Sequence, residues 1–167
     1  DARTPFFTNE DEKRLLYELS QMSNKNHLRL TKLALATGFR RSELLSLTWR
    51  NIDLKKEKIY IQRKECAARG GSNSMRIVPL PSDAKMLLRS FESKEGKVLT
   101  ITKGAARNGF DKARKRAGLE TLRFHDLRHI AISRMWSSGM NALEISACSG
   151  HRDIKMLMRY SHYQLSF

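Results

Sequence analysis

Cysteine and long apolar stretches are both scarce in this sequence. The 167 residues include two cysteines, Cys66 and Cys148, which form no CxxC pair and cannot build a disulfide framework. The expected location is therefore a reducing compartment, the cytoplasm. No apolar run approaches the roughly 20 residues of a membrane-spanning helix, and the first residues lack the apolar core of a secretion signal. The pattern argues against disulfide-stapled secreted domains and membrane-spanning proteins.

Acidic residues are few beside basic ones. The sequence has 17 Asp and Glu against 32 Lys and Arg, which gives a formal net charge of +15 and a pI near 10.3. Such a charge on a small domain points to a polyanionic partner, with nucleic acid as the first candidate. An anionic membrane surface is disfavoured because the basic residues are dispersed and not gathered on one amphipathic helix. The basic segment Lys103–Ala117 is a candidate face for following a phosphate backbone.

Helical periodicity dominates the chain, which is long enough for one domain and too short for two comfortable ones. The expected helices are Phe6–Ser20, His27–Thr37, Ser42–Leu47, Ser82 to about Phe91, Lys103–Ala117, His125–Ser138 and two that follow Asn141 and Asp153. Thr8 is the expected N-cap of the first helix, and Gly38 the expected end of the second. His27 is expected at the surface.

Strand-like alternation occurs in one region. Lys58–Lys64 alternates apolar and polar residues, and Met75–Leu80 is its expected partner. The segment Glu65–Ser74 between them, with two adjacent glycines, is expected to be a long hairpin loop. The predicted fold is therefore mainly α with a small antiparallel β-sheet, an α+β architecture.

Residues suited to phosphate chemistry gather near the C-terminus. His125 and Arg128 are three residues apart, so one helical turn presents them to the same side. His151 follows a Ser-Gly pair that is typical of a helix end, and Tyr160 lies nine residues further on. Two imidazoles, a guanidinium and a phenol are thus expected near one another.

These motifs resemble the tyrosine recombinases, the phage-integrase family, whose catalytic domain carries H-x-x-R, then G-H, then Tyr nine residues after that histidine. An upstream block, T-G-F-R-R-S-E-L at residues 37–44, resembles a second family motif. The resemblance covers nearly the whole chain and implies a single catalytic domain over residues 1–167. The DNA-clasping domain that usually precedes it is expected to be absent from this chain. The sequence also lacks a starting Met, which suggests an excised fragment of a longer protein.

The resemblance implies a role for each motif residue. Arg40 and Arg128 would hold the oxygens of the scissile phosphate, His125 would exchange protons, and His151 would donate a hydrogen bond to a phosphate oxygen. Tyr160 would be the nucleophile that forms a 3′-phosphotyrosyl intermediate. Guanidinium groups would replace a metal ion, so no metal or cofactor is expected. The implied protein is a bacterial, phage or mobile-element enzyme that acts on double-stranded DNA, as a homotetramer in its full-length form.

A catalytic lysine is also implied, at the end of the first strand of the hairpin. Lys64 fits best as the residue that protonates the leaving 5′ oxygen, and Lys56 and Lys58 are alternatives.

The residues alone leave the identity of the catalytic arginine and of the nucleophilic tyrosine open. Arg41 competes with Arg40, and Tyr163 competes with Tyr160. Glu43 is expected to organise the arginine and not to act as an acid. Ser149 replaces the leucine of the family's L-G-H, and we expect this change to affect helix packing and not chemistry.

Two other functions remain compatible with this sequence, and two more are disfavoured by it. A DNA-binding module without catalysis and a type IB topoisomerase both remain candidates. A zinc site at His125 and His129 lacks the usual glutamate after the first histidine and has no evident third ligand. A Ser/His/Asp hydrolase is disfavoured because no nucleophile elbow is present.

Overall fold

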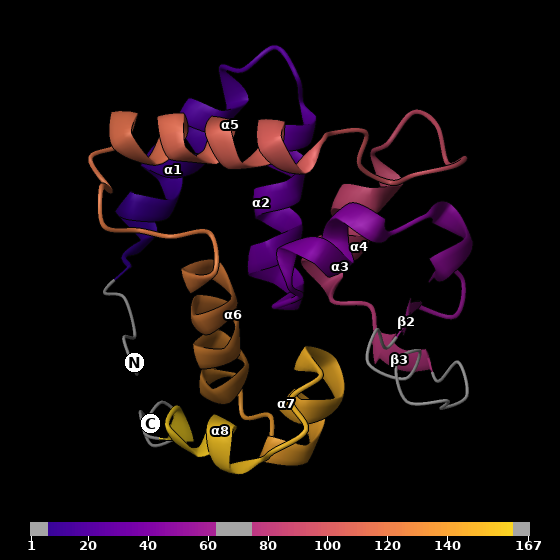
Figure 1. The fold of residues 1–167 in the computed structure, drawn as a ribbon. Helices are drawn as coiled ribbons and strands as arrows, with labels where there is room; N and C mark the ends of the chain where they lie inside the picture. Colours follow the sequence, from indigo (N-terminus) through magenta and orange to yellow (C-terminus); the bar gives the residue numbers. More distant parts are fainter. Residues whose placement is uncertain (1–6, 63–74, 162–167) are drawn as a thin grey trace.

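The computed structural model describes residues 7–62 and 75–161 as a mainly helical domain with a small sheet at one side (Figure 1). The helices are α1 (Asn9–Ser20), α2 (Asn26–Thr37), α3 (Arg41–Ser46), the 3-10 helix η1 (Trp49–Asn51), α4 (Ser82–Arg89), α5 (Lys103–Arg116), α6 (Asp126–Ser137), α7 (Ala142–Ser149) and α8 (Lys155–Met158). The predicted mainly α fold with a small antiparallel sheet is confirmed. Within the described ranges, no helix is long and apolar enough to cross a membrane.

Side-chain caps fix several helix starts. The Thr8 hydroxyl accepts a hydrogen bond from the Asp11 backbone N–H at 3.1 Å, and the Asp11 carboxylate accepts one from the Thr8 N–H at 2.8 Å. This capping box starts α1 at Asn9 and not at the predicted Phe6. Asp153 was a wrong choice of N-cap, because α8 begins after Ile154. Its carboxylate still accepts a hydrogen bond from the first helical N–H, that of Lys155, at 2.8 Å.

Helix α2 lies at the centre of the domain. It contacts α1, α3, α4, α5 and α6 (Figure 1), and its buried Leu30, Leu33 and Ala34 belong to the main hydrophobic core. The surface position expected for His27 was wrong. This side chain is half-buried, and the space beside Gly109 of α5 is filled by its ring.

The sheet has three antiparallel strands in the order β1 (Ile52–Asp53), β2 (Lys58–Gln62) and β3 (Met75–Pro79). The expected hairpin is present, but the two-residue strand β1 was not predicted. In β3 the buried positions are Arg76 and Val78, whereas Ile77 is exposed. An arginine therefore occupies an inward-facing position of this strand.

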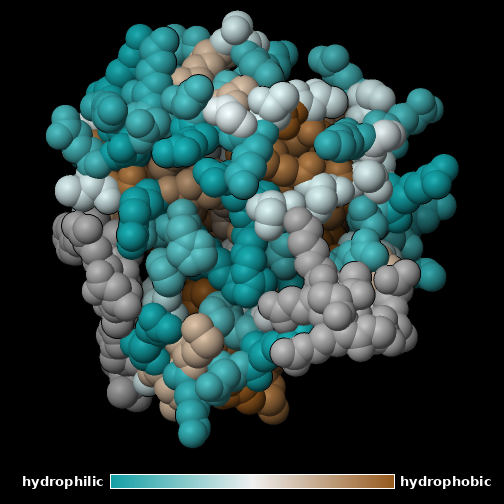
Figure 2. Space-filling view, viewed as in Figure 1, coloured by the Kyte–Doolittle hydropathy of each residue, from teal (hydrophilic) through white to brown (hydrophobic). Residues whose placement is uncertain are grey.

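A second, smaller hydrophobic cluster attaches the C-terminal helices to α6. Its buried members are Ile132, Trp136, Ile145, Leu157 and Tyr160. Helices α7 and α8 thereby pack beside the end of α6, below the main core in the view of Figure 1. Hydrophilic side chains cover most of the face seen in Figure 2, and the basic α5 exposes Arg107, Lys112 and Lys115. This surface agrees with the charge expected for a polyanion-binding domain.

Candidate active site

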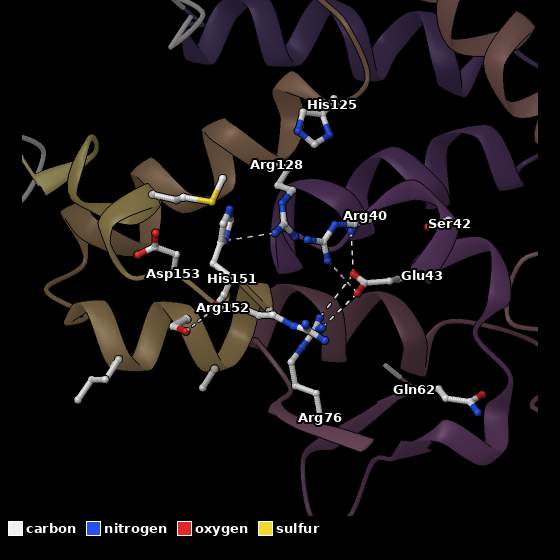
Figure 3. A pocket seen from close by; sticks show the side chains of 15 residues that line it. Arg40, Ser42, Glu43, Gln62, Arg76, His125, Arg128, His151, Arg152 and Asp153 are labelled. Atoms are coloured by element: carbon white, nitrogen blue, oxygen red, sulfur yellow. Dashed lines mark hydrogen bonds and ion pairs between the residues drawn. The ribbon is translucent and has the colours of Figure 1, made fainter. Parts of the chain in front are cut away.

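A pocket of about 950 Å³ gathers four of the six predicted site residues. Arg40, His125, Arg128 and His151 all line it (Figure 3). They come from the turn before α3, the start and first turn of α6, and the turn after α7. Segments more than a hundred residues apart in the sequence thus contribute side chains to one cavity.

A left-handed turn places Arg40 at this pocket. Gly38 ends α2 with φ of 68°, a conformation that strains residues with a Cβ. The buried Phe39 anchors the next position, and Arg40 is the N-cap residue of α3, with its side chain 47% exposed. Its competitor Arg41 does not line the pocket, and its guanidinium lies over the Phe124 ring, 5.6 Å from the centroid.

Arg128 is buried and tied to both sides of the pocket. One terminal nitrogen donates to the Gly38 carbonyl at 2.7 Å, and the other donates to Nδ1 of His151 at 3.2 Å. Burial, together with the positive charge of Arg40, lowers the pKa of Arg128 to about 10. The guanidinium therefore remains charged at neutral pH, in a fixed orientation.

His151 is held in one tautomer by its neighbours. Nδ1 accepts from Arg128, and the Ser149 hydroxyl lies 2.7 Å from the same nitrogen. Because an arginine can only donate, the neutral ring carries its proton on Nε2. Burial, reinforced by the charges of Arg128 and Arg40, lowers the pKa of His151 to about 4. Ser149 is buried, and its hydroxyl also touches a pocket histidine, so the expectation that it affects packing and not chemistry stays a prediction to be tested.

His125 occupies the N-cap position of α6 beside the same arginines. Burial lowers the pKa of His125, and Arg128 lowers it further, against an opposing effect of Asp126. At neutral pH the imidazole is therefore mainly uncharged and available to accept a proton.

Tyr160 is not among the residues that line the pocket. The side chain is 2% exposed, and its hydroxyl forms a short hydrogen bond with Nδ1 of His129. The two rings also stack, with centroids 5.9 Å apart and an interplanar angle of 26°. His129, considered above as a zinc ligand, thus contacts the phenol. In the part of the chain that the structure describes, no three His, Cys, Asp or Glu side chains are grouped as metal ligands.

The predicted lysine Lys64 and the alternative tyrosine Tyr163 lie outside the described residues, so both assignments stay predictions. Gln62, the last described residue of β2, lines the pocket. The alternatives Lys56 and Lys58 are exposed near the other end of that strand and do not line the pocket.

A buried arginine is among the pocket residues that the sequence analysis did not name. Arg76 of β3 is 7% exposed and lines the cavity. It donates to Glu43 of α3, with Nη1 3.1 Å from Oε1 and Nη2 3.5 Å from Oε2. Glu43 also accepts the Arg40 backbone N–H at 2.9 Å, so the expected organising role of Glu43 fits its contacts.

The sequence is similar to that of known proteins of one family. The sequence matches the Phage integrase family model over residues 5–166. It is 38% identical over 132 residues to the shufflon-specific DNA recombinase of Escherichia coli, covering 78% of this chain and 33% of that protein. It is 33% identical over 163 residues to the integrase of Escherichia phage 186, covering 95% of this chain and 44% of that integrase. The chain thus spans less than half the length of these two relatives.

Solved structures show the same fold. The catalytic domain of bacteriophage HP1 integrase superposes with a TM-score of 0.79 at 29% identity, covering 98% of this chain and 90% of that one. XerH site-specific recombinase bound to difH substrate matches with a TM-score of 0.72 at 20% identity, covering 98% of this chain and 51% of that chain, which shows the fold alone. By its sequence match and its fold, the chain belongs to the phage integrase family of tyrosine recombinases.

Proposed function

We propose that this chain is the catalytic domain of a site-specific recombinase that cuts and rejoins double-stranded DNA through a 3′-phosphotyrosyl intermediate. The observation that carries the proposal is the convergence of Arg40, His125, Arg128 and His151 on one pocket. Two guanidinium groups and an imidazole Nε2–H offer the donors that a phosphodiester needs on its non-bridging oxygens. The net charge of +15 suits a DNA partner.

In the proposed reaction the Tyr160 oxygen attacks the scissile phosphorus. The new tyrosine O–P bond forms as the bond from phosphorus to the 5′ oxygen breaks, and the departing oxygen takes a proton. Lys64 is the proposed donor of that proton, and His125 the group that exchanges the phenol proton. Arg40 and Arg128 neutralise the charge that develops on the phosphate, so the proposed reaction uses no metal ion or cofactor.

The position of Tyr160 adds a requirement to this scheme. Its hydroxyl contacts His129 and is enclosed by the second hydrophobic cluster, so the phenol has to leave this position to reach a phosphate in the pocket. Helix α8, just before Tyr160, has four residues. A shift of this segment would expose part of the second hydrophobic cluster, to which Leu157 and Tyr160 both belong, so we propose that DNA binding compensates for the lost packing. In the longer protein, we propose that the active assembly is a homotetramer on DNA.

The test is covalent capture of DNA. The chain is incubated with a pool of random duplexes that carry a nick close to a fixed position, so that the short 5′-hydroxyl fragment diffuses away after cleavage. We expect DNA to remain attached after denaturing washes, and sequencing to identify a preferred site. A module that only binds DNA would yield no adduct. Paired sites should then recombine, whereas relaxation of supercoils without strand exchange would indicate a type IB topoisomerase.

A further inference from the structure

Arg76 occupies an unusual place for an arginine, on the inward face of a strand. Its backbone pairs with Ile61 of β2, and its side chain shares a face with the buried Val78. The guanidinium lies 5.5 Å from the centroid of the Phe39 ring. Burying such a charge is costly unless it is paired and hydrogen-bonded. Its partner is the Glu43 carboxylate.

Glu43 serves two arginines with one carboxylate. Arg76 approaches Oε1 to 3.1 Å, whereas Nη1 of Arg40 is 3.5 Å from the same oxygen. Burial raises the pKa of Glu43, but the hydrogen bond and charge of Arg76, with smaller contributions from Arg40, hold that pKa below its usual value. The carboxylate is therefore charged, and Arg76 is its main partner.

The pairing leaves Arg40 available to a ligand. Arg40 keeps a 47% exposed side chain, whereas that of Arg76 is 7% exposed. In Figure 3 the Arg40 guanidinium lies between Glu43 and Arg128, and Arg76 approaches Glu43 from the opposite side. Without Arg76, Arg40 would be the remaining ion-pair partner of the buried carboxylate among the residues that the structure describes. The carboxylate would then compete with a phosphate for that guanidinium.

The turn before His151 is built against the same guanidinium. Gly150 ends α7 with φ of 77°, and a Cβ there would lie 2.3 Å from Nη1 of Arg76. A side chain at this position would be both strained and blocked. Arg76 thus touches the segments that carry Arg40 and His151, two of the proposed phosphate ligands.

We propose that Arg76 is a positioning residue, which neutralises Glu43 and so keeps the contact of Arg40 with that carboxylate weak enough for the Arg40 guanidinium to bind the scissile phosphate. Arg76 itself does not contact the phosphate in this proposal, because its Nε is buried and its other nitrogens face Glu43 and Gly150. The inference rests on the proposed role of Arg40 in cleavage.

The first test measures cleavage at saturating DNA in a single turnover, with the nicked duplex selected above. Arg76→Gln should slow cleavage on the order of ten- to a hundredfold, as expected for a misplaced catalytic group. Adding Glu43→Gln should restore most of the rate. The side-chain oxygen of glutamine can still accept a hydrogen bond from the backbone N–H of Arg40. Because glutamine carries no negative charge, it no longer competes with the phosphate for the Arg40 guanidinium. Arg89→Gln, at an exposed position of α4, is the control for simple loss of charge.

The rescue separates positioning from a general structural role. A slow Arg76→Gln variant that Glu43→Gln fails to rescue would overturn the proposal, as would wild-type cleavage by Arg76→Gln. If Arg76→Gln does not fold, Arg76→Lys is the second variant: lysine keeps the charge that neutralises Glu43, so cleavage should stay within a few-fold of the wild type, and a loss of ten- to a hundredfold would overturn the proposal.

A second measurement does not depend on cleavage. In nuclear magnetic resonance spectra of the arginine side chains, the Arg40 guanidinium should rotate more slowly in Arg76→Gln than in the wild type, because its 3.5 Å contact with Glu43 should tighten when Arg76 is lost. Unchanged Arg40 signals would overturn the proposal even if no DNA is cut. Loss of the proposed function would show instead as a wild-type chain that gives no covalent adduct.

Discussion

The Tyr160 hydroxyl is hydrogen-bonded to Nδ1 of His129, and the two rings stack. Burial and the charge of His125 lower the pKa of His129, so its ring is mainly neutral at pH 7 and can accept the phenol hydrogen. The proposed nucleophile is therefore docked on the residue that follows Arg128 in α6 and is not among the residues that line the pocket.

This docking predicts slow chemical modification of Tyr160 in the free chain. Nitration by tetranitromethane should be at least about tenfold slower at Tyr160 than at Tyr17, because the buried ring reacts only after local opening. Tyr17 is 61% exposed and Tyr160 2% exposed. His129→Ala should speed the nitration of Tyr160 and leave that of Tyr17 unchanged. Equal rates at the two tyrosines in the wild type would contradict the docked state.

Arg40 and its neighbour Arg41 should differ sharply in cleavage. Arg40→Ala removes a proposed phosphate ligand and should lower the rate at saturating DNA by about a hundredfold or more, on the order of 3 kcal/mol. Arg41→Ala removes a guanidinium that lies over Phe124, away from the pocket, and should change the rate by a few-fold at most. The cleavage rates of both variants are measured by trapping the covalent adduct in a single turnover. A larger loss in Arg41→Ala would mean that the wrong arginine has been assigned.

The Ser149 hydroxyl should add to the burial and the arginine charges that lower the pKa of His151, because it can donate to Nδ1 of the neutral ring. The pKa of about 4 in the fold lies below the unfolded value of 6.5, so the unfolded state binds more protons between these pH values. Stability is therefore lost as pH falls from about 6.5 towards 4. Ser149→Ala removes a donor to Nδ1, which should raise the pKa of His151 towards its unfolded value and so make this loss of stability smaller.

The prediction is checked by following the nuclear magnetic resonance signals of the histidine rings as the pH is varied. His27 on α2 is the internal control, because burial also lowers its pKa but Ser149 does not contact it. The same His151 pKa in wild type and Ser149→Ala would show that the hydroxyl has no influence.

Two glycines of α5 should respond in opposite directions to alanine. A Cβ at Gly109 would lie 2.1 Å from the His27 ring, whereas a Cβ at Gly104 would meet nothing within 4 Å. Gly109→Ala should cost about 1–3 kcal/mol of unfolding free energy through overpacking. Gly104→Ala should be neutral or stabilising by up to about 1 kcal/mol, because alanine favours a helix. Urea denaturation measures both, and equal effects would argue against the packing of α2 on α5.

The sequence was informative where local signals determine structure. Helix periodicity and caps such as Thr8 predicted the helices, and the motif at residues 125–128 predicted a shared helical face. The strand β1 has two residues, too short for any alternation to be visible. The contacts of Ser149 with His151 depend on how a turn folds back, which local patterns do not specify.

Arg76 was missed for a related reason. Its partner Glu43 is 33 residues away in the sequence, and only the tertiary fold brings them together. A signal was nevertheless present, because residues 76, 78 and 80 share one face of an alternating strand, and Val78 and Leu80 are apolar. An arginine in register with two core residues indicates a buried charge that needs a partner.

Mapping the DNA attachment site tests the central claim most directly. The chain is trapped on the selected nicked duplex and digested with protease, and the nucleotide-bearing peptide is fragmented by mass spectrometry to separate Tyr160 from Tyr163. The account predicts attachment at Tyr160, no adduct with Tyr160→Phe, and a normal adduct with Tyr163→Phe. Attachment at Tyr163, or an adduct that survives in Tyr160→Phe, would contradict it.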